Sequence, residues 1–408
     1  MRGAEAPLRG ELRAVLGATF LVRFAFGITT AVFASYLTGR TSGLVPSEFG
    51  LVGLVTALAS IAEFSTVLFS GLAADRWGRW PILGGGMVLA AATTLGFAFS
   101  RSAEWLGGLN FAFGIASGGI LAASLAVVAD EASDGTRGHE MGRYDAVNLA
   151  GWIVGFAVGF AALGLLANDQ LGWIFPVGTL SIAGGLVYAR ASFRRARPTA
   201  GAASARNLRA ITEPRVLAVT LPWLMIYMLI GAALVFLGVA AGGIGVPPLY
   251  LAVAIGVGGL ALTVTQPIFG AMADRYGTTR LLIAGTGGFV LVLFGAILLA
   301  TFPISAVAIA LVAIGAVGGL AYGPAAFAAL AELSRSVNRA TTMAICTLFI
   351  SLGMALGLLL ASQLYQAFGP AGIDSFFAGI ALALIGLAAV RYRQAPVHPL
   401  FALTTRAR

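Results

Sequence analysis

Long apolar stretches, separated by short polar turns, run the length of this chain. Each stretch approaches the roughly 20 residues that a helix needs to cross the hydrocarbon of a bilayer. Backbone groups in lipid must hydrogen-bond internally, and continuous runs of this kind are unlike the alternating strands of a membrane barrel. The pattern therefore predicts an all-α membrane protein. The twelve predicted spans lie near 14–38, 47–70, 81–100, 105–129, 144–167, 171–190, 216–240, 246–269, 280–300, 303–330, 341–366 and 371–391.

A short phrase occurs twice between predicted spans, 199 residues apart. Residues 71–79 read GLAADRWGR, and residues 270–277 read GAMADRYG. Further matches at nearly the same offset pair Gly118-Gly119 with Gly318-Gly319, Glu131 with Glu332, and Met141, Gly151 and Gly155 with Met343, Gly353 and Gly357. Two halves that repeat an even number of spans share one six-helix fold in parallel topology, an arrangement typical of transporters.

The longest connection divides six spans from six. It carries six arginines, with a proline and several small residues, and is the natural linker between two bundles. The expected organisation is an N-terminal six-helix bundle at 1–190, a basic linker at 191–215, a C-terminal six-helix bundle at 216–391 and a tail at 392–408.

Composition places most of the surface in lipid. The 408 residues are 59% hydrophobic and 10% charged, whereas a soluble domain carries roughly 25% charged residues. The net charge of +9 comes from arginines in short loops, so membrane orientation explains it better than nucleic acid, which we do not expect as a partner. The loop bias predicts a multi-pass protein of the cell (cytoplasmic) membrane with both termini in the cytoplasm. The first apolar run is too long for a secretory signal, so we expect it to be a retained helix.

The phrase at 71–79, with the spacing G-x-x-x-D-R-x-G-R, resembles the signature loop between helices two and three of the major facilitator superfamily. The resemblance covers the whole chain, because the twelve spans, the two halves, the basic central loop and the second copy all fit. It implies two bundles that rock about a central site and expose it to each side in turn.

The same resemblance implies a gate at this loop. Asp75 would lie against the start of the eleventh helix, near Arg339 and Ala340, where free backbone N–H groups favour a carboxylate. Arg79 or Arg76 would pair with Asp130 or Glu131, and these contacts would hold the outward-open state. The expected gating residues are Gly71, Asp75, Arg76, Gly78, Arg79, Asp130, Glu131, Gly270, Asp274, Arg275 and Gly277.

The chain departs from the family's drug exporters in two spans. Those members often carry an intramembrane arginine in the fourth span, where this chain has Asn110. They often show a glycine–proline pattern in the fifth, where this chain keeps Gly151, Gly155 and Gly159 but has Phe156. Both departures argue against a proton-driven drug antiporter of the usual pattern.

Two charged residues fall well inside the predicted spans, Arg23 in the first and Glu63 in the second. A charge at the bilayer centre costs about 2.5–3.5 kcal/mol on insertion scales, so each should face a partner or a central cavity. Arginine stays charged, which makes Glu63 the titratable member. A permanent ion pair that locks two helices and a switchable transport site both remain open.

The second half has no deep charge and offers milder polar groups, an asymmetry that suits an amphiphilic or lipid-like substrate. The expected coupling and substrate residues are Glu63, Arg23, Asn110, Asn148, Trp152, Tyr227, Gln266 and Tyr322. An intramembrane asparagine often only bonds a neighbouring helix, and glycine and tryptophan often only pack.

The leading hypothesis is a proton-coupled secondary transporter of a small organic or amphiphilic molecule, possibly an exporter. A uniporter or importer of an organic anion held by Arg23, and a flippase of a lipid-like substrate, are the alternatives. We expect a monomer among membrane lipids, without cofactor or metal. A membrane enzyme is disfavoured, because the acidic cluster Asp130, Glu131, Asp134, Glu140 and Asp145 is interpreted as the loop between helices four and five.

Overall fold

Helices account for every regular element among the described residues of this computed structural model, which are 5–40, 49–100, 102–132, 136–193, 214–243, 248–301, 305–333 and 339–394. The first half holds α1 (Glu5–Arg40), α2 (Phe49–Trp77), α3 (Arg79–Phe99), α4 (Ala103–Glu131), α5 (Arg137–Leu165), the short 3-10 turn η2 (Leu171–Trp173) and α6 (Ile174–Phe193). The second half holds α7 (Pro214–Gly243), α8 (Pro248–Thr263), α9 (Gln266–Tyr276), α10 (Thr278–Thr301), α11 (Ala306–Gly319), α12 (Tyr322–Leu333), α13 (Arg339–Phe368) and α14 (Pro370–Gln394).

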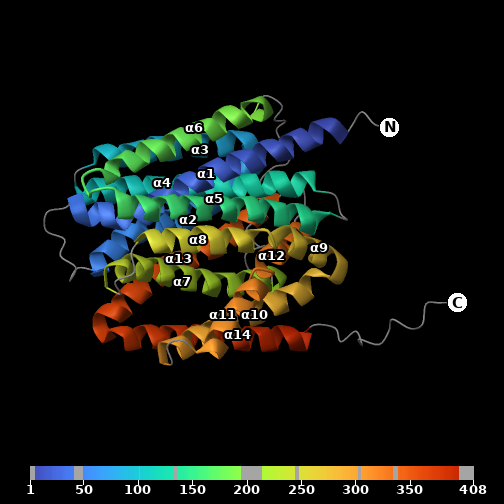
Figure 1. The fold of residues 1–408 in the computed structure, drawn as a ribbon. Coiled ribbons are helices and arrows are strands. Elements are labelled where there is room, and N and C mark those ends of the chain that lie inside the picture. The colour runs from blue at the N-terminus through green and yellow to red at the C-terminus, as the bar shows by residue number, and fades with distance from the viewer. Residues whose placement is uncertain are drawn as a thin grey trace.

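The helices have the lengths and the apolar character of membrane spans. Eleven segments of the described chain are long and apolar enough to cross a bilayer, and α14 adds a shorter apolar stretch, Asp374–Val390. Helix α1 begins and α14 ends at the same end of the molecule (Figure 1). The prediction of an all-α membrane protein is therefore confirmed.

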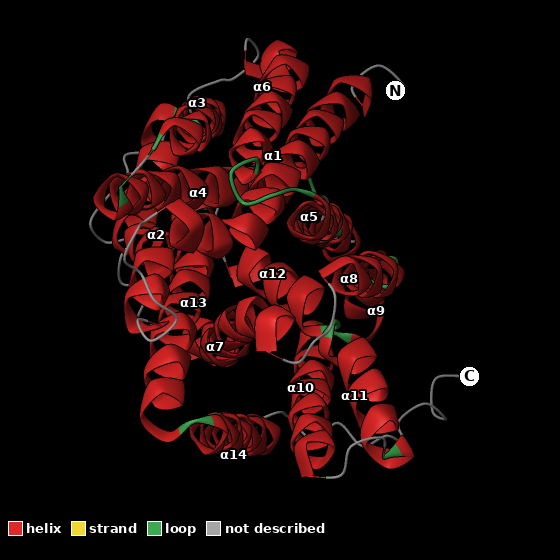
Figure 2. Ribbon diagram, turned by 60° about the vertical axis from the view of Figure 1, so that its left-hand side comes forward, coloured by secondary structure: helices red, strands yellow, loops and turns green. Residues whose placement is uncertain are grey.

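The two halves form two neighbouring bundles, α1–α6 above and α7–α14 below in Figure 1. They meet along two seams, one between α2 and α13 and the other between α5 and the pair α8 and α9. Figure 2 shows the second seam where α5 lies beside α8, while α11 and α14 lie at the outer edge of the second half. The site is built at these seams.

Glycines that repeat in the sequence do the same work in both halves. A methyl group on Gly151 or Gly155 of α5 would collide with the backbone of α1 at Phe20 or Phe24. Their counterparts in α13, Gly353 and Gly357, would collide with the backbone of α7. Small residues let membrane helices approach this closely. The α1–α5 pair and the α7–α13 pair are therefore equivalent close contacts in the two halves.

Two of the predicted spans of the second half are broken. The span predicted at 246–269 divides between Thr263 and Gln266, and the span predicted at 303–330 divides between Gly319 and Tyr322. Proline lacks a backbone N–H and is tolerated best in the first turn of a helix. Pro267 and Pro324 lie in the first turns of α9 and α12, which explains why the helices restart there.

Helix α5 begins earlier than the sequence predicted. It starts at Arg137 rather than near residue 144, because polar residues such as Glu140 and Arg143 extend it beyond the apolar stretch and form an ion pair of 3.0 Å. Asp145, interpreted from the sequence as part of a loop, therefore lies within the helix and is buried. Asp134 of the same cluster lies outside the described residues.

Candidate functional site

The first copy of the repeated phrase closes the α2–α13 seam at one end of the bundles. Asp75 is fully buried, and its carboxylate accepts hydrogen bonds from the Ala340 N–H (3.1 Å), the Thr341 N–H (2.9 Å) and the Thr341 hydroxyl (2.6 Å). The two N–H groups belong to the first turn of α13, where backbone donors have no partner within the helix and the helix dipole is positive. The structure thus places Asp75 where the family resemblance implied.

An ion-pair chain extends from this carboxylate to the exposed Asp130. The Arg79 guanidinium lies 3.2 Å from Asp75 Oδ1, and its Nε donates to Asp130 Oδ2 at 3.0 Å. Of the pairings left open by the sequence, the structure forms the one between Arg79 and Asp130. Arg76 is exposed, and Glu131 keeps one buried carboxylate oxygen without a hydrogen-bond partner.

The second copy closes the α5–α9 seam in the same way. Asp274 accepts hydrogen bonds from the N–H groups of Gly138 (2.8 Å) and His139 (2.9 Å), in the first turn of α5. Gly270 leaves room for this contact, because a methyl group there would meet the Gly138 backbone. Each half therefore offers one aspartate to the N-terminus of a helix of the other half.

A glycine ends the phrase in both copies for a steric reason. Gly78 has φ 102° and Gly277 has φ 89°, values that residues with a side chain rarely adopt. Gly78 separates α2 from α3, and Gly277 separates α9 from α10. The sharp turn at each glycine holds the neighbouring aspartate against the facing helix.

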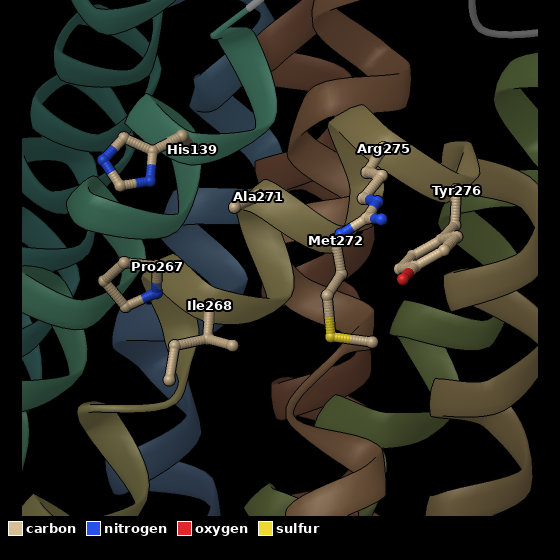
Figure 3. Close-up of a pocket in the computed structure, with 7 residues that line it drawn as sticks. All are labelled: His139, Pro267, Ile268, Ala271, Met272, Arg275 and Tyr276. Carbon is tan, nitrogen blue, oxygen red and sulfur yellow. The ribbon is translucent and has the colours of Figure 1, made fainter.

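Arg275 of the second copy lies on the outer surface. It stacks 5.3 Å from the centroid of the Tyr276 ring and lines a hollow of about 440 Å³ between α5 and α9. Figure 3 shows His139 of α5 across this hollow from Pro267 and Ile268 of α9. The hollow is therefore open to the surface along the α5–α9 seam.

The seams are also in contact at the opposite end of the bundles. A methyl group on Gly53 of α2 would lie 2.8 Å from the Ser362 hydroxyl oxygen of α13, and one on Gly164 of α5 would lie 3.8 Å from Leu249 Cβ of α8. The halves thus touch near both ends of both seams, which is a closed arrangement around the polar groups between them.

Glu63 lies in the α2–α13 seam and joins the two halves. Its carboxylate lies beside Ser117 of α4 in the first half and Ser351 of α13 in the second, whose hydroxyl donates to the Thr347 carbonyl at 2.6 Å. Gly118 of α4 packs beside the Glu63 side chain, because a methyl group added to Gly118 would lie 3.3 Å from Glu63 Cγ. Protonation or deprotonation of Glu63 would therefore change its interactions with both halves.

Arg23 interacts with Glu63 through space and does not pair with it directly. Among the described residues, Arg79 and Arg143 have a nitrogen within 4.0 Å of a carboxylate oxygen, whereas Arg23 forms no such ion pair. Arg23 is 4% exposed, its Cζ lies 5.4 Å from the Phe26 ring centroid, and its side chain lies near Tyr144. Its Nε has no partner, so the guanidinium keeps a free buried donor.

Asp145 is a further buried carboxylate that sequence reasoning missed. It is 7% exposed in α5, near Asn148 of the same helix, and the side-chain amide of Gln266 in α9 donates to its Oδ2 at 3.2 Å. The polar first turns of α5 hid it, because they read as a loop. A helical reading from Arg137 would have placed Asp145 and Asn148 on one face, three residues apart.

Three of the predicted residues lie near these charges. Tyr227 lies within electrostatic reach of Asp145, Arg23 and Glu63. Gln266 and Asn148 contact Asp145, and Asn148 Oδ1 has no partner. The structure thus brings together Arg23, Glu63, Asn148, Tyr227 and Gln266, from α1, α2, α5, α7 and α9.

Three predicted residues have packing contacts instead. The Asn110 amide donates to the Val55 and Thr56 carbonyls at 2.9 and 3.1 Å, which holds α4 against α2. Tyr322 is fully buried and donates its hydroxyl to the Val219 carbonyl at 2.6 Å. Trp152 stacks on Phe156, with the ring centroids 5.2 Å apart.

A family model and solved structures match this architecture. The model described as "Major Facilitator Superfamily" matches residues 15–247 and 224–406, once for each half. The human organic anion transporter MFSD10 (TETRAN) superposes with a TM-score of 0.75 at 16% identity, over 94% of this chain and 99% of that one. The proton:xylose symporter XylE gives 0.75 at 16%, over 95% and 96%, and the nucleoside transporter NupG 0.62 at 12%, over 94% and 100%.

A curated relative matches part of the chain. It is "Uncharacterized MFS-type transporter YybF" of Bacillus subtilis (strain 168), 30% identical over 143 residues. The match spans about a third of each protein, 35% of this chain and 33% of the relative. The family model covers both halves of the chain, and the repeated fold and the two aspartate-capped seams agree with it. This chain therefore belongs to the major facilitator superfamily of membrane transporters.

Proposed function

We propose that this protein is a proton-coupled secondary transporter of a small organic or amphiphilic molecule, with Glu63 as the coupling carboxylate. It works in the cell membrane, as a monomer with both termini in the cytoplasm, and exports its substrate. The fold itself does not select a substrate, because structures of this fold include, by their titles, an organic anion transporter, a proton:xylose symporter and a nucleoside transporter.

One observation carries the proposal: the Glu63 carboxylate lies between the two halves, beside Ser117 of the first and Ser351 of the second. An acidic residue within a membrane span is costly and marks a pathway for ions or substrate. Protonation changes which hydrogen bonds this carboxyl group accepts or donates. Proton binding therefore acts directly on the contact that must break when the halves separate.

Arg23 is the electrostatic partner in this mechanism. While Glu63 is ionised, the nearby guanidinium is balanced by it through space. Once Glu63 is protonated, Arg23 is left with an uncompensated charge and a free Nε donor. Proton uptake then strengthens the attraction of the site for an anionic or strongly polar group.

The free Nε also supports a second candidate, a uniporter or importer of an organic anion. Here Arg23 would anchor the anion, and Glu63 would have only a structural role. The two candidates differ in whether protons move with the substrate.

The test uses the purified protein in liposomes that contain a pH dye, with a panel of organic anions, cations and amphiphiles. We compare the native protein with Glu63→Gln, and with Glu104→Gln as a control at an exposed position of α4. We expect a substrate-triggered proton flux in the native protein and the control, and its loss in Glu63→Gln.

Two outcomes would contradict this proposal. If Glu63→Gln couples protons as the native protein does, Glu63 is not the coupling group. If labelled substrate crosses without proton flux and responds to membrane potential, the anion uniporter is the better description.

A further inference from the structure

Arg23 and Asn148 each have one buried polar atom without a hydrogen-bond partner among the described residues. These atoms are Arg23 Nε, a donor, and Asn148 Oδ1, an acceptor. Arg23 is 4% exposed and Asn148 is 9% exposed. Asn148 lies near the Asp145 carboxylate, which suits its NH₂ group, so its oxygen is the free end. Unpaired buried polar atoms are costly, and these two suit a ligand that brings one acceptor and one donor.

The two side chains lie close together in the first half, where α1 packs against α5. Tyr144, Asn148 and Gly151 follow one another at helical spacing along one stripe of α5. A methyl group on Gly151 would lie 2.8 Å from Arg23 Cβ, and Tyr144 lies near the Arg23 side chain. Arg23 thus meets this stripe on both sides of Asn148. One small ligand can therefore reach both free atoms.

An aromatic cluster of the second half faces this pair. In α7 and α12, the Trp223 ring centroid lies 4.6 Å from that of Phe327 and 6.2 Å from that of Tyr227. Phe327 also meets the Tyr144 ring across the boundary between the halves, edge to face at 6.3 Å. Tyr227 lies within electrostatic reach of Arg23 and is partly exposed. This cluster therefore presents an aromatic surface close to the guanidinium.

The three features together select a particular kind of molecule. A guanidinium binds a carboxylate through its N–H donors, and an amide oxygen accepts from a hydroxyl or amino group. Aromatic side chains pack on planar rings in offset or edge-to-face arrangements. The nearby carboxylates do not favour a cation instead. Asp145 already accepts from the Gln266 amide at 3.2 Å, and Glu63 is protonated when the substrate binds in the proposed mechanism.

We propose that the substrate is a small aromatic carboxylate that also carries a hydroxyl or amino group. Its carboxylate binds the Arg23 guanidinium, its hydroxyl or amino group donates to Asn148 Oδ1, and its ring packs on Tyr227. The inference rests on the proposed function, because it names the substrate class of that transport site. Binding of the acid depends on these three side chains, whereas proton coupling depends on Glu63.

The experiment measures binding of a series of probes to the purified full-length protein in detergent, by isothermal titration calorimetry. The meta and para isomers of hydroxybenzoate carry all three features. Benzoate lacks the hydroxyl group, benzamide lacks the negative charge, and cyclohexanecarboxylate lacks the aromatic ring. We expect one hydroxybenzoate isomer to bind about fivefold more tightly than benzoate, as for one neutral hydrogen bond. Relative to benzoate, benzamide should bind about tenfold more weakly and cyclohexanecarboxylate about threefold more weakly.

Matched variants assign each feature of the probe to a residue. Asn148→Ala should bind hydroxybenzoate and benzoate equally, whereas Asn110→Ala, which removes an amide that joins α4 to α2, should keep the preference. Arg23→Lys keeps the charge but loses Nε, so it should weaken every carboxylate about tenfold. Tyr227→Leu should lose the preference for benzoate over cyclohexanecarboxylate. Tyr188→Leu, at an exposed position of α6, should keep it.

Several results would overturn this inference. If the native protein binds none of the probes, or binds benzamide as tightly as benzoate, Arg23 does not hold a carboxylate. If Asn148→Ala keeps the preference for hydroxybenzoate, water satisfies Oδ1 and the hydroxyl group binds elsewhere. If Tyr227→Leu still prefers benzoate to cyclohexanecarboxylate, the ring does not pack on Tyr227. Should Arg23→Lys fail to fold, the benzamide comparison in the native protein decides the same point.

Glu63→Gln separates this inference from the proposed function. Without the negative charge of Glu63, Arg23 attracts a carboxylate more strongly, so the variant should bind benzoate several-fold more tightly while its proton flux is lost. If the native protein binds the probes in the expected order but moves no protons with them, proton coupling is wrong and the substrate class stands. If proton flux is triggered only by molecules of another class, the substrate class is wrong and the coupling stands.

Discussion

Asp75 and Asp274 occupy equivalent places in the two halves, and their surroundings differ. Asp75 is fully buried, receives three hydrogen bonds and contacts Arg79. Asp274 is exposed and receives two. At the scale of the residue, burial decides how much each carboxylate contributes, because a buried guanidinium left without its partner is costly.

We therefore expect unequal losses from Asp75→Ala and Asp274→Ala. The first should destabilise the protein by about 3–5 kcal/mol, since it removes a fully buried carboxylate that pairs with the buried Arg79 guanidinium. The second should cost about 1 kcal/mol, as for loss of a helix cap. Thermal unfolding in detergent measures both, and equal losses would show that burial does not distinguish the two seams.

Asn110 offers a test of packing against function. Its amide joins α4 to the Val55 and Thr56 carbonyls of α2. Asn110→Ala should lower stability by about 1 kcal/mol, the usual size of a hydrogen bond between membrane helices. Substrate affinity in the same variant should be unchanged. A loss of affinity at unchanged stability would return Asn110 to the substrate site.

At the scale of the element, close helix pairs depend on glycines with specific neighbours. Gly155 of α5 faces Phe24 and Ile28 of α1, and Gly357 of α13 faces Met228 of α7. These contacts are equivalent across the repeat, so a methyl group should have the same effect in either half.

Gly155→Ala and Gly357→Ala should each cost about 1–3 kcal/mol, because the added carbon overpacks backbone that cannot give way. Gly85→Ala is the matched control, since Gly85 is an exposed glycine of α3 with no heavy atom within 4 Å of an added carbon. Denaturation midpoints compare the three. If Gly85→Ala loses as much stability as the other two, the close contacts are not responsible.

Element by element, the sequence predicted what long apolar runs and repeated phrases can specify. The spans and the two halves need only length, periodicity and the spacing of the phrase, whereas the placement of Asp75 against the eleventh helix was implied by the resemblance to the superfamily. The breaks before α9 and α12 were missed, although Pro267 and Pro324 signalled them, because hydropathy alone does not register a lost N–H. Asp145 was missed because the start of a helix outside the membrane resembles a loop in composition.

At the scale of the whole molecule, the two seams determine how the halves can move. The seams are in contact at the end that carries the repeated phrase and at the opposite end. Alternating access by rigid bundles requires one end to part while the other stays closed. Locking an end should therefore stop the cycle, and a lock within one bundle should not.

A disulfide across one seam tests this movement. Gly164→Cys with Leu249→Cys joins α5 to α8, where the Cβ separation is 3.8 Å and suits a disulfide. We expect oxidation to abolish transport and reduction to restore it. The control, Ala25→Cys with Gly178→Cys, joins α1 to α6 within the first half at 3.7 Å and should leave transport intact. Transport that persists through the first cross-link would contradict rocking of rigid halves.

The single cysteine of the chain can report how often the two halves part. Cys346 is fully buried in α13 and interacts with Asp145 and Tyr227 at the centre of the molecule. A water-soluble alkylating reagent can reach its sulfur only during the intervals when the halves part. The rate of alkylation of the unmodified protein therefore counts those openings directly. The native thiol can therefore time the cycle without any engineered label.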